Sequence, residues 1–184
     1  PPVYPPQPAG IWRHVGRNAP KFVAATAENR FRRGVYVVWR RGAPYASFVN
    51  FDAPDRGACV VERPRTNTPL QALTLLNDEA HVEMALALAA RIVSEPDLPG
   101  DEERIGFAFR VALSRPAKPA EVAELMKLLA KRTEELAAQP KTARQLVGDV
   151  KEWRVPPGVK ARDLAKWFAV ANVLLNLDEA ITRG

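Results

Sequence analysis

The chain has 184 residues, of which 47% are hydrophobic, and a net charge of +6 at pH 7. This length suits one domain, or one domain with a long irregular arm, and the apolar fraction is sufficient for a core. The single cysteine, Cys59, excludes an internal disulfide, a Cys-x-x-Cys redox pair and covalent haem attachment. With only two histidines besides, we expect no dedicated transition-metal site.

The start of the chain predicts a fragment of a larger protein. It begins Pro1-Pro2-Val3 without an initiator Met, and no charged segment followed by an apolar one marks a signal peptide. No uncharged apolar stretch reaches the length of about 18 residues that a transmembrane helix needs. We therefore expect that upstream residues have been removed or that only part of the parent is present.

Positive charge is concentrated in the first third of the chain. Residues 1–66 hold eleven basic side chains against four acidic ones, and ten of the eleven are arginine. Guanidinium groups bind carboxylate, sulfate or phosphate through two parallel hydrogen bonds, so this excess favours an anionic partner. A general coding preference for arginine, which outnumbers lysine nineteen to eight in the whole chain, explains the same excess equally well.

Residues 1–30 predict a proline-rich arm packed on the domain. Five prolines within the first eight residues fix the backbone and remove amide donors, which favours extended polyproline II structure. Tyr4, Ile11 and Trp12 are the side chains that we expect to anchor this arm.

Residues 31–66 predict a small antiparallel β-ribbon and a loop. The segment 34–39 is rich in β-branched and aromatic residues, and 58–63 is a second short strand in which Cys59 would be a small buried residue. Between them, the stretch from Phe48 to Asp55 has room for one helical turn. Because two short strands alone are marginal, the ribbon must lean on helices.

Residues 67–184 predict a bundle of five or six helices, so the fold class is mainly α and the chain is one domain overall. Thr68-Pro69 begins the first helix, and Asn77-Asp78 ends it and caps the next, at about 79–94. Further helices are expected from Asp101, from Pro119, at 141–150 and at 161–177. The expected inward stripes are Val82, Leu86, Ala89 and Val93, then Ile105, Phe109 and Ala112, then Val122, Leu125, Met126 and Leu129.

The last predicted helix, 161–177, is apolar nearly all round and therefore belongs in the middle of the bundle. Asn172 and Asn176 lie four residues apart on it and share one face. Because buried amides must form hydrogen bonds, we expect them to tie the helix to loop backbone, with ligand binding as the less favoured alternative.

Asp52 and Asp55, in the sequence Phe51-Asp52-Ala53-Pro54-Asp55-Arg56, are the candidate catalytic residues. Two carboxylates three residues apart could serve as a general acid and base or as a nucleophile pair. The structural interpretation is a proline turn in which both aspartates accept hydrogen bonds from backbone amides and the arginines pair with them. The structural interpretation is the favoured one.

An anion site is the best single-site hypothesis, at the start of the helix that begins at Pro69. Helix N-termini present unpaired amides, and the candidate anion-binding residues are Arg56, Arg63, Arg65 and Asn67.

Three longer segments carry a family resemblance: 31–36, 51–56 and the run Arg65-Thr66-Asn67-Thr68-Pro69-Leu70-Gln71-Ala72-Leu73 with Leu75-Leu76-Asn77-Asp78. They resemble the C-terminal domain of unknown function in large planctomycete-type proteins, which often carry an N-terminal cytochrome c-like domain. The opening 2–8 and the closing 171–179 also fit, so the resemblance spans nearly the whole chain. The family's frequent double arginine after the cysteine is Glu62-Arg63 here.

The resemblance implies export to the periplasm or cell surface, a multidomain parent, and haem c in an upstream domain with no cofactor in this fragment. It also links such parents to polysaccharide use. Our first hypothesis is a non-catalytic structural or interaction module whose partners are other domains of the same parent. The alternative is part of a carbohydrate-active enzyme acting on an anionic polysaccharide, with Asp52 and Asp55 as acid and base. Nucleic-acid binding ranks last, because the basic residues lie in strand and loop and form no recognition helix.

Overall fold

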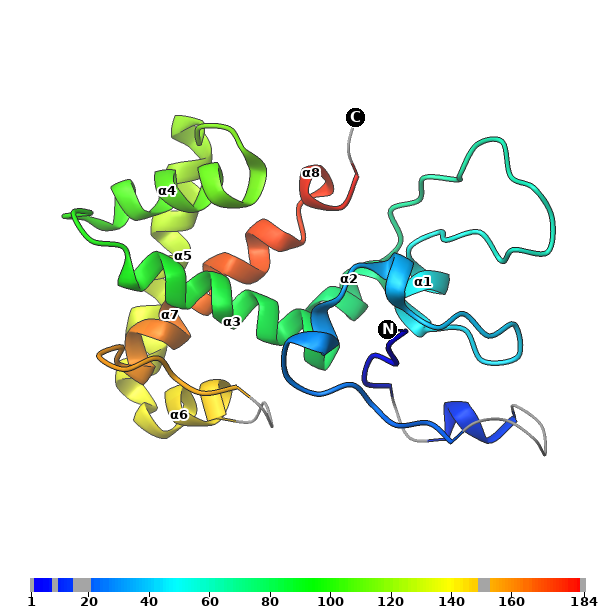
Figure 1. The fold of residues 1–184 in the computed structure, drawn as a ribbon. Coiled ribbons are helices and arrows are strands. Elements are labelled where there is room, and N and C mark those ends of the chain that lie inside the picture. The colour runs from blue at the N-terminus through cyan, green and yellow to red at the C-terminus, as the bar shows by residue number, and fades with distance from the viewer. Residues whose placement is uncertain (1, 8–9, 15–20, 149–152, 183–184) are drawn as a thin grey trace. The chain divides into compact units, whose positions relative to one another are not determined.

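The computed structural model describes residues 2–7, 10–14, 21–148 and 153–182 (Figure 1). The chain divides into two compact units, unit 1 (residues 1–74) and unit 2 (residues 75–184). The boundary falls inside helix α2 (Pro69–Asn77), eight residues after the predicted border at 66/67. None of the helices in the described parts is long and apolar enough to span a membrane.

Unit 1 is built from short helical turns. These are the 3-10 helices η1 (Ile11–His14), η2 (Ala27–Phe31) and η3 (Gly34–Tyr36), followed by α1 (Ala46–Asn50) and the first part of α2. The end of α1 is attached to α2 because Asn50 Nδ2 donates to Thr74 Oγ1 at 2.9 Å. Such short turns have few internal hydrogen bonds, so the contacts between them hold the unit together.

The predicted antiparallel β-ribbon is wrong, because the described residues contain no strand pair. At the first candidate strand, the amide of Val37 donates to the carbonyl of Gly34 and closes the helical turn η3. The second candidate strand, residues 58–63, is exposed along its whole length. A two-stranded ribbon is marginal in water, and neither segment has a third strand or a buried face to stabilise it.

The backbone after η3 pairs with the arm instead. Val3 and Val37 form an isolated parallel bridge, in which Val3 N donates to Tyr36 O at 2.9 Å and Val38 N donates to Val3 O at 3.0 Å. Both bridge residues are buried, which excludes water from these hydrogen bonds.

Aromatic rings hold the arm, as expected for two of its three predicted anchors. Tyr4 meets Trp12 edge to face at 5.4 Å between ring centroids, and Phe22 lies 5.8 Å from Tyr4 and 5.3 Å from Trp12. Such pairs add attraction beyond the apolar area that they bury. Pro1 and Pro8 of the predicted arm lie outside the described residues.

Unit 2 is a helical bundle, so the mainly α prediction is confirmed. Its helices are α3 (Glu79–Ser94), α4 (Asp101–Leu113), α5 (Pro119–Ala138), α6 (Pro140–Gly148), α7 (Ala161–Leu175) and α8 (Asp178–Ile181). The predicted starts at Pro69, Glu79, Asp101, Pro119 and Ala161 match the structure. The short α8 was not predicted, and the last two residues of the predicted helix 141–150 lie outside the described part.

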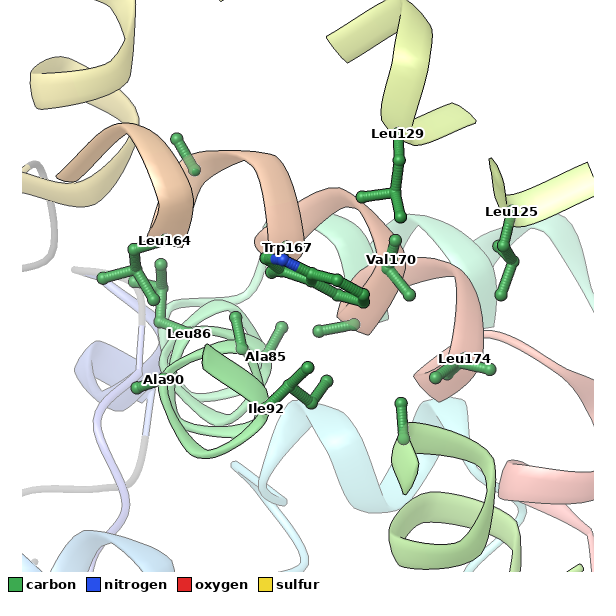
Figure 2. Packing of buried hydrophobic residues seen from close by; sticks show 14 of the residues in the cluster. Ala85, Leu86, Ala90, Ile92, Leu125, Leu129, Leu164, Trp167, Val170 and Leu174 are labelled. Atoms are coloured by element: carbon green, nitrogen blue, oxygen red, sulfur yellow. The ribbon is translucent and has the colours of Figure 1, made fainter. Parts of the chain in front are cut away.

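Helix α7 is the centre of this bundle, as its apolar sequence predicts. It packs against α3, α4, α5, α6 and α8. Figure 2 shows Trp167 and Val170 of α7 between Leu129 of α5 and Ile92 of α3. The side chains of Trp167 and Val170 are 2% and 0% exposed. Burial of such large apolar side chains contributes about 1.5–3 kcal/mol each, so this helix carries much of the stability of unit 2.

Polar side chains fix the helix ends of unit 2. Asp78 caps α3 by accepting from the amides of Ala80 and His81. At the other end of α3, the guanidinium of Arg104 donates to the carbonyls of Ile92 and Val93, which have no partner within the helix.

Asn172 of α7 and Asn176, which directly follows the helix, behave differently from the prediction. Asn176 Nδ2 donates to Asn172 O at 3.1 Å, within the same helix end, and so ties the helix to itself and not to a loop. The side chain of Asn172 lies at a groove, described below.

Candidate functional site

An exposed loop in unit 1 is clamped at its base. We call residues 53–65 the clamped loop. Its ends meet because Asp52 Oδ2 accepts two hydrogen bonds from Thr66, from the backbone amide at 2.9 Å and from the hydroxyl at 2.7 Å. Compact surface loops whose ends are held together are frequent carriers of binding sites.

The charge of Asp52 is stabilised by these contacts. The two hydrogen bonds from Thr66 and the nearby guanidinium of Arg63 together hold the pKa of Asp52 below its ordinary value. The backbone of Asp52 has a φ of +57°, in the left-handed region that aspartate tolerates better than most residues. Residue type and conformation therefore agree with a turn residue that anchors a loop.

Side chains at the start of helix α2 hold Thr66 in place. Thr68 and Gln71 form a reciprocal capping pair, in which Gln71 N donates to Thr68 Oγ1 and Thr68 N donates to Gln71 Oε1. The side-chain nitrogen Nε2 of Gln71 also donates to Thr66 Oγ1 at 3.0 Å. Because the Gln71 side chain is only 1% exposed, it fixes Thr66 without competition from water.

Two of the predicted anion-binding arginines are used within unit 1. Arg63 donates from Nη2 to Phe51 O at 3.0 Å and from Nε to Asp52 O at 3.2 Å, which adds a second tie at the loop base. The guanidinium of Arg56 lies over the Trp39 ring at 5.1 Å from its centroid. This cation–π contact attaches the first half of the clamped loop to unit 1.

The other two predicted residues, Arg65 and Asn67, are exposed at the end of the clamped loop. In the described part of the chain Arg65 has no ion-pair or hydrogen-bond partner, so of the three predicted arginines it is the one that is available to a ligand. The expected anion site at the start of α2 stays a prediction. Its geometry is less open than expected, because the capping pair and the Asp52 carboxylate already satisfy amides there.

The aspartate pair accepts from backbone amides, as the structural interpretation expects, whereas Arg63, expected to pair with a carboxylate, donates to backbone carbonyls. Asp55 Oδ1 accepts from the amide of Gly57 at 2.8 Å, and Asp52 accepts from Thr66. Both candidate catalytic carboxylates are therefore bound to backbone amides. A glycosidase pair needs both carboxylates free to face a sugar across a cleft. The catalytic role of Asp52 and Asp55 stays a prediction without support from this geometry.

The tip of the clamped loop is apolar and exposed. Cys59 is a free, exposed thiol, so its predicted burial in a strand is wrong. Beside it, Val60 and Val61 are 47% and 105% exposed. Neighbouring exposed aliphatic residues form a small apolar surface that a binding partner could bury. The sequence suggested a strand here because β-branched residues are typical of strands and also occur in exposed apolar loops such as this one.

Sequence reasoning missed the partners of Asp52. The Thr68–Gln71 capping pair was readable from the spacing Thr-x-x-Gln before an apolar run. The contact of Asp52 with Thr66 joins residues fourteen positions apart across an irregular loop, and no local pattern signals it. Among the described residues no group of three or more His, Cys, Asp or Glu side chains could hold a metal ion.

Comparison with known proteins identifies a family but no activity. No curated protein and no solved structure matches the chain. The model of the family PSD1, described as a protein of unknown function (DUF1553), matches residues 1–129. This supports the resemblance to a domain of unknown function, whereas the cytochrome context and export implied by that resemblance stay predictions. Since the match covers more than half of the sequence, the chain belongs to the PSD1 family of proteins of unknown function (DUF1553).

Proposed function

We propose that the chain is a non-catalytic interaction module of a larger exported protein, and that the clamped loop is its contact surface. The observation that carries this proposal is the combination of a fixed base and an exposed apolar tip. Asp52 and Thr66 hold the base, and the side chain of Val61 at the tip is fully exposed to solvent. A loop whose base is already fixed loses less entropy on binding than a free segment, which favours its use in recognition.

The partner that we propose is another domain of the same parent chain with an acidic surface around an apolar recess. Unit 1 contains eleven basic side chains against four acidic ones, and Arg65 beside the loop base is exposed. Complementary charge steers such a contact, while the aliphatic tip supplies the buried area. By resemblance, the parent would carry haem c in an upstream cytochrome-like domain, and this chain would hold none.

Cys59 gives a direct test, because its thiol marks the loop tip. Its rate of alkylation by a neutral maleimide is measured in the isolated chain and in the longer parent protein. We expect the rate to fall at least tenfold in the parent, because the tip is buried against the partner domain. The substitution Val61→Asp in the parent should restore the rate, because it places a charge in the apolar contact, whereas Val49→Asp, at an exposed valine on α1, should not.

Equal alkylation rates in the two proteins would refute the interdomain contact. Protection of Cys59 in the isolated chain by an anionic polysaccharide, without protection in the parent, would also refute it and would assign the loop to glycan binding. Loss of a glycan-cleaving activity in Asp52→Asn and Asp55→Asn variants of the parent would contradict the non-catalytic role.

A further inference from the structure

Unit 2 contains a groove that is lined by residues of this unit alone. It lies along α5, α6 and α7 and has a volume of about 530 Å³. Leu136 of α5, Leu146 of α6 and Phe168 of α7 form its apolar wall. This volume is within the range of about 300–1,000 Å³ that is typical of small-ligand sites.

Small residues on α7 explain why the groove is open. Ala165 and Ala169 face it one helical turn apart, where larger side chains would fill the space between α5 and α7. Phe168 beside them is only partly buried, so one side of its ring is available for contact. The apolar floor is thus part of the α7 surface itself and belongs to the most firmly packed helix of unit 2.

Three uncharged polar side chains also line the groove. Thr142 Oγ1 donates to Gln139 Oε1 at 3.2 Å, which orients the Gln139 amide at the rim. Asn172, one turn beyond Phe168, also lines the groove, and its side-chain amide has no hydrogen-bond partner among the described residues. Amide and hydroxyl groups both donate and accept, so they match ligand hydroxyls in either direction.

The charged residues of the groove neutralise each other. Arg132 Nη1 donates to Glu135 Oε2 at 2.7 Å in an ion pair at the rim. A charged ligand would have to compete with this pair. A purely apolar ligand would leave the side-chain amide of Asn172 without a partner, which costs binding free energy.

We propose that this groove binds a neutral ring that carries several hydroxyl groups and one apolar face, that is, a pyranose sugar. The C–H face of the ring lies against Phe168, where the negative face of the aromatic ring attracts the polarised hydrogens. The hydroxyls exchange hydrogen bonds with Gln139, Thr142 and Asn172. This inference concerns unit 2 alone and does not depend on the function proposed for the clamped loop.

The test is ligand-observed NMR on the full chain with the methyl glycosides of glucose, galactose, mannose and xylose as probes. We expect saturation transfer to at least one of them at millimolar concentration. Cyclohexanol lacks the ring of hydroxyls and glucuronate carries a charge, so each should bind at least tenfold more weakly than that glycoside. Ala169→Phe, which fills the groove, should abolish binding, whereas Ala130→Phe, at an exposed alanine of α5 outside it, should leave binding unchanged.

A second pair of variants keeps the test decisive if Ala169→Phe does not fold. Asn172→Leu removes the unpartnered amide and should weaken binding about tenfold, the effect of one lost hydrogen bond. Gln145→Leu likewise replaces a side-chain amide by leucine, at an exposed position of α6 outside the groove, and should have no effect. Circular dichroism confirms the fold of each variant. Absence of binding by all four glycosides, equal binding of cyclohexanol, or equal affinity of the Asn172→Leu and Gln145→Leu variants would overturn the proposal.

Discussion

Asp52 and Thr66, fourteen residues apart, are joined by two hydrogen bonds that end on a single carboxylate oxygen. The backbone amide and the hydroxyl of Thr66 both donate to Oδ2 of Asp52. A residue at one end of the clamped loop therefore controls the position of the residue at the other end, and the loop opens only when both bonds break.

Removal of the Thr66 hydroxyl should loosen the clamped loop without unfolding unit 1. In Thr66→Val the hydrogen bond from the backbone amide to Asp52 remains, but the hydrogen bonds that the hydroxyl forms with Asp52 and Gln71 are lost. We expect trypsin to cut after Arg56 and Arg65 several-fold faster, because local opening exposes these sites more often. Thr66→Ser keeps the hydroxyl and should be cut at the wild-type rate. Equal rates in the two variants would show that the hydroxyl is not part of the clamp.

The stability of unit 2 should fall in acid because of a network around Arg115. Its guanidinium donates to Glu121 of α5 at 2.7 and 2.9 Å and to Glu179 of α8 at 2.6 and 2.9 Å. These bonds lower the pKa of Glu121 from 4.5 to about 2 and also lower that of Glu179. A carboxylate with a depressed pKa in the folded state stabilises the fold above its unfolded pKa, and this contribution is lost as the pH falls toward the folded value.

The measurement is the thermal unfolding midpoint between pH 7 and pH 2 in the wild type and in Glu121→Gln. We expect the gap between the two proteins to be largest above about pH 5 and to close toward pH 2, where Glu121 becomes protonated in the folded protein as well. Glu124→Gln, on the same helix and in an exposed ion pair with Lys127, is the control and should follow the wild type. A gap independent of pH would contradict the assignment.

Two neighbouring residues of α7 should differ sharply in their effect on stability. Leu174 is fully buried, whereas Val173 is 41% exposed. Leu174→Ala leaves a cavity in the core and should lower the free energy of unfolding by about 2–5 kcal/mol. Val173→Ala should change it by about 0.5 kcal/mol or less. Denaturant unfolding followed by circular dichroism measures both, and similar losses would show that α7 is not oriented as described.

The start of α3 should depend on the Asp78 side chain. Burial disfavours its charge, but hydrogen bonds from His81 and from the amides of His81 and Ala80 outweigh burial and lower the pKa of Asp78. Asp78→Ala removes the cap and should reduce the free energy of unfolding by about 1 kcal/mol. Asp78→Asn keeps an acceptor and should lose much less. If the two variants were equally destabilised, the charge and not the cap would be the stabilising feature.

The helical part of the fold was predictable because its signals are local. Pro69, Pro119 and the Asn77-Asp78 pair mark helix boundaries within one or two residues, and the apolar character of 161–177 identifies the central helix. Individual inward residues were less secure: Ile105, Phe109, Leu125 and Leu129 are buried as expected, but Ala85 and Ile92 of α3 were missed. A helix rich in alanine and leucine has apolar residues on several faces, so its stripe alone does not fix its orientation.

Unit 1 was harder to predict because its structure depends on contacts between distant residues. The β-branched segments 34–39 and 58–63 satisfy the local signal for strands, but pairing is decided by what lies beside them. Val3 of the arm forms the β-bridge with Val37, so the segment around Cys59 has no strand partner among the described residues and stays exposed. The composition of the candidate site was predictable, since Asp52 and Arg63 both belong to it. Their use as ties to backbone groups and not as a cleft is visible only in three dimensions.

The closed base of the clamped loop makes the length of that loop nearly independent of the rest of the fold. Since Asp52 and Thr66 already lie side by side, added or removed residues between them cost only the small change in chain entropy that comes with loop size. The fold of unit 1 should therefore accept longer or shorter segments here while the supporting helices stay as they are. The same property makes it a suitable position for inserting a foreign peptide or a reporter tag.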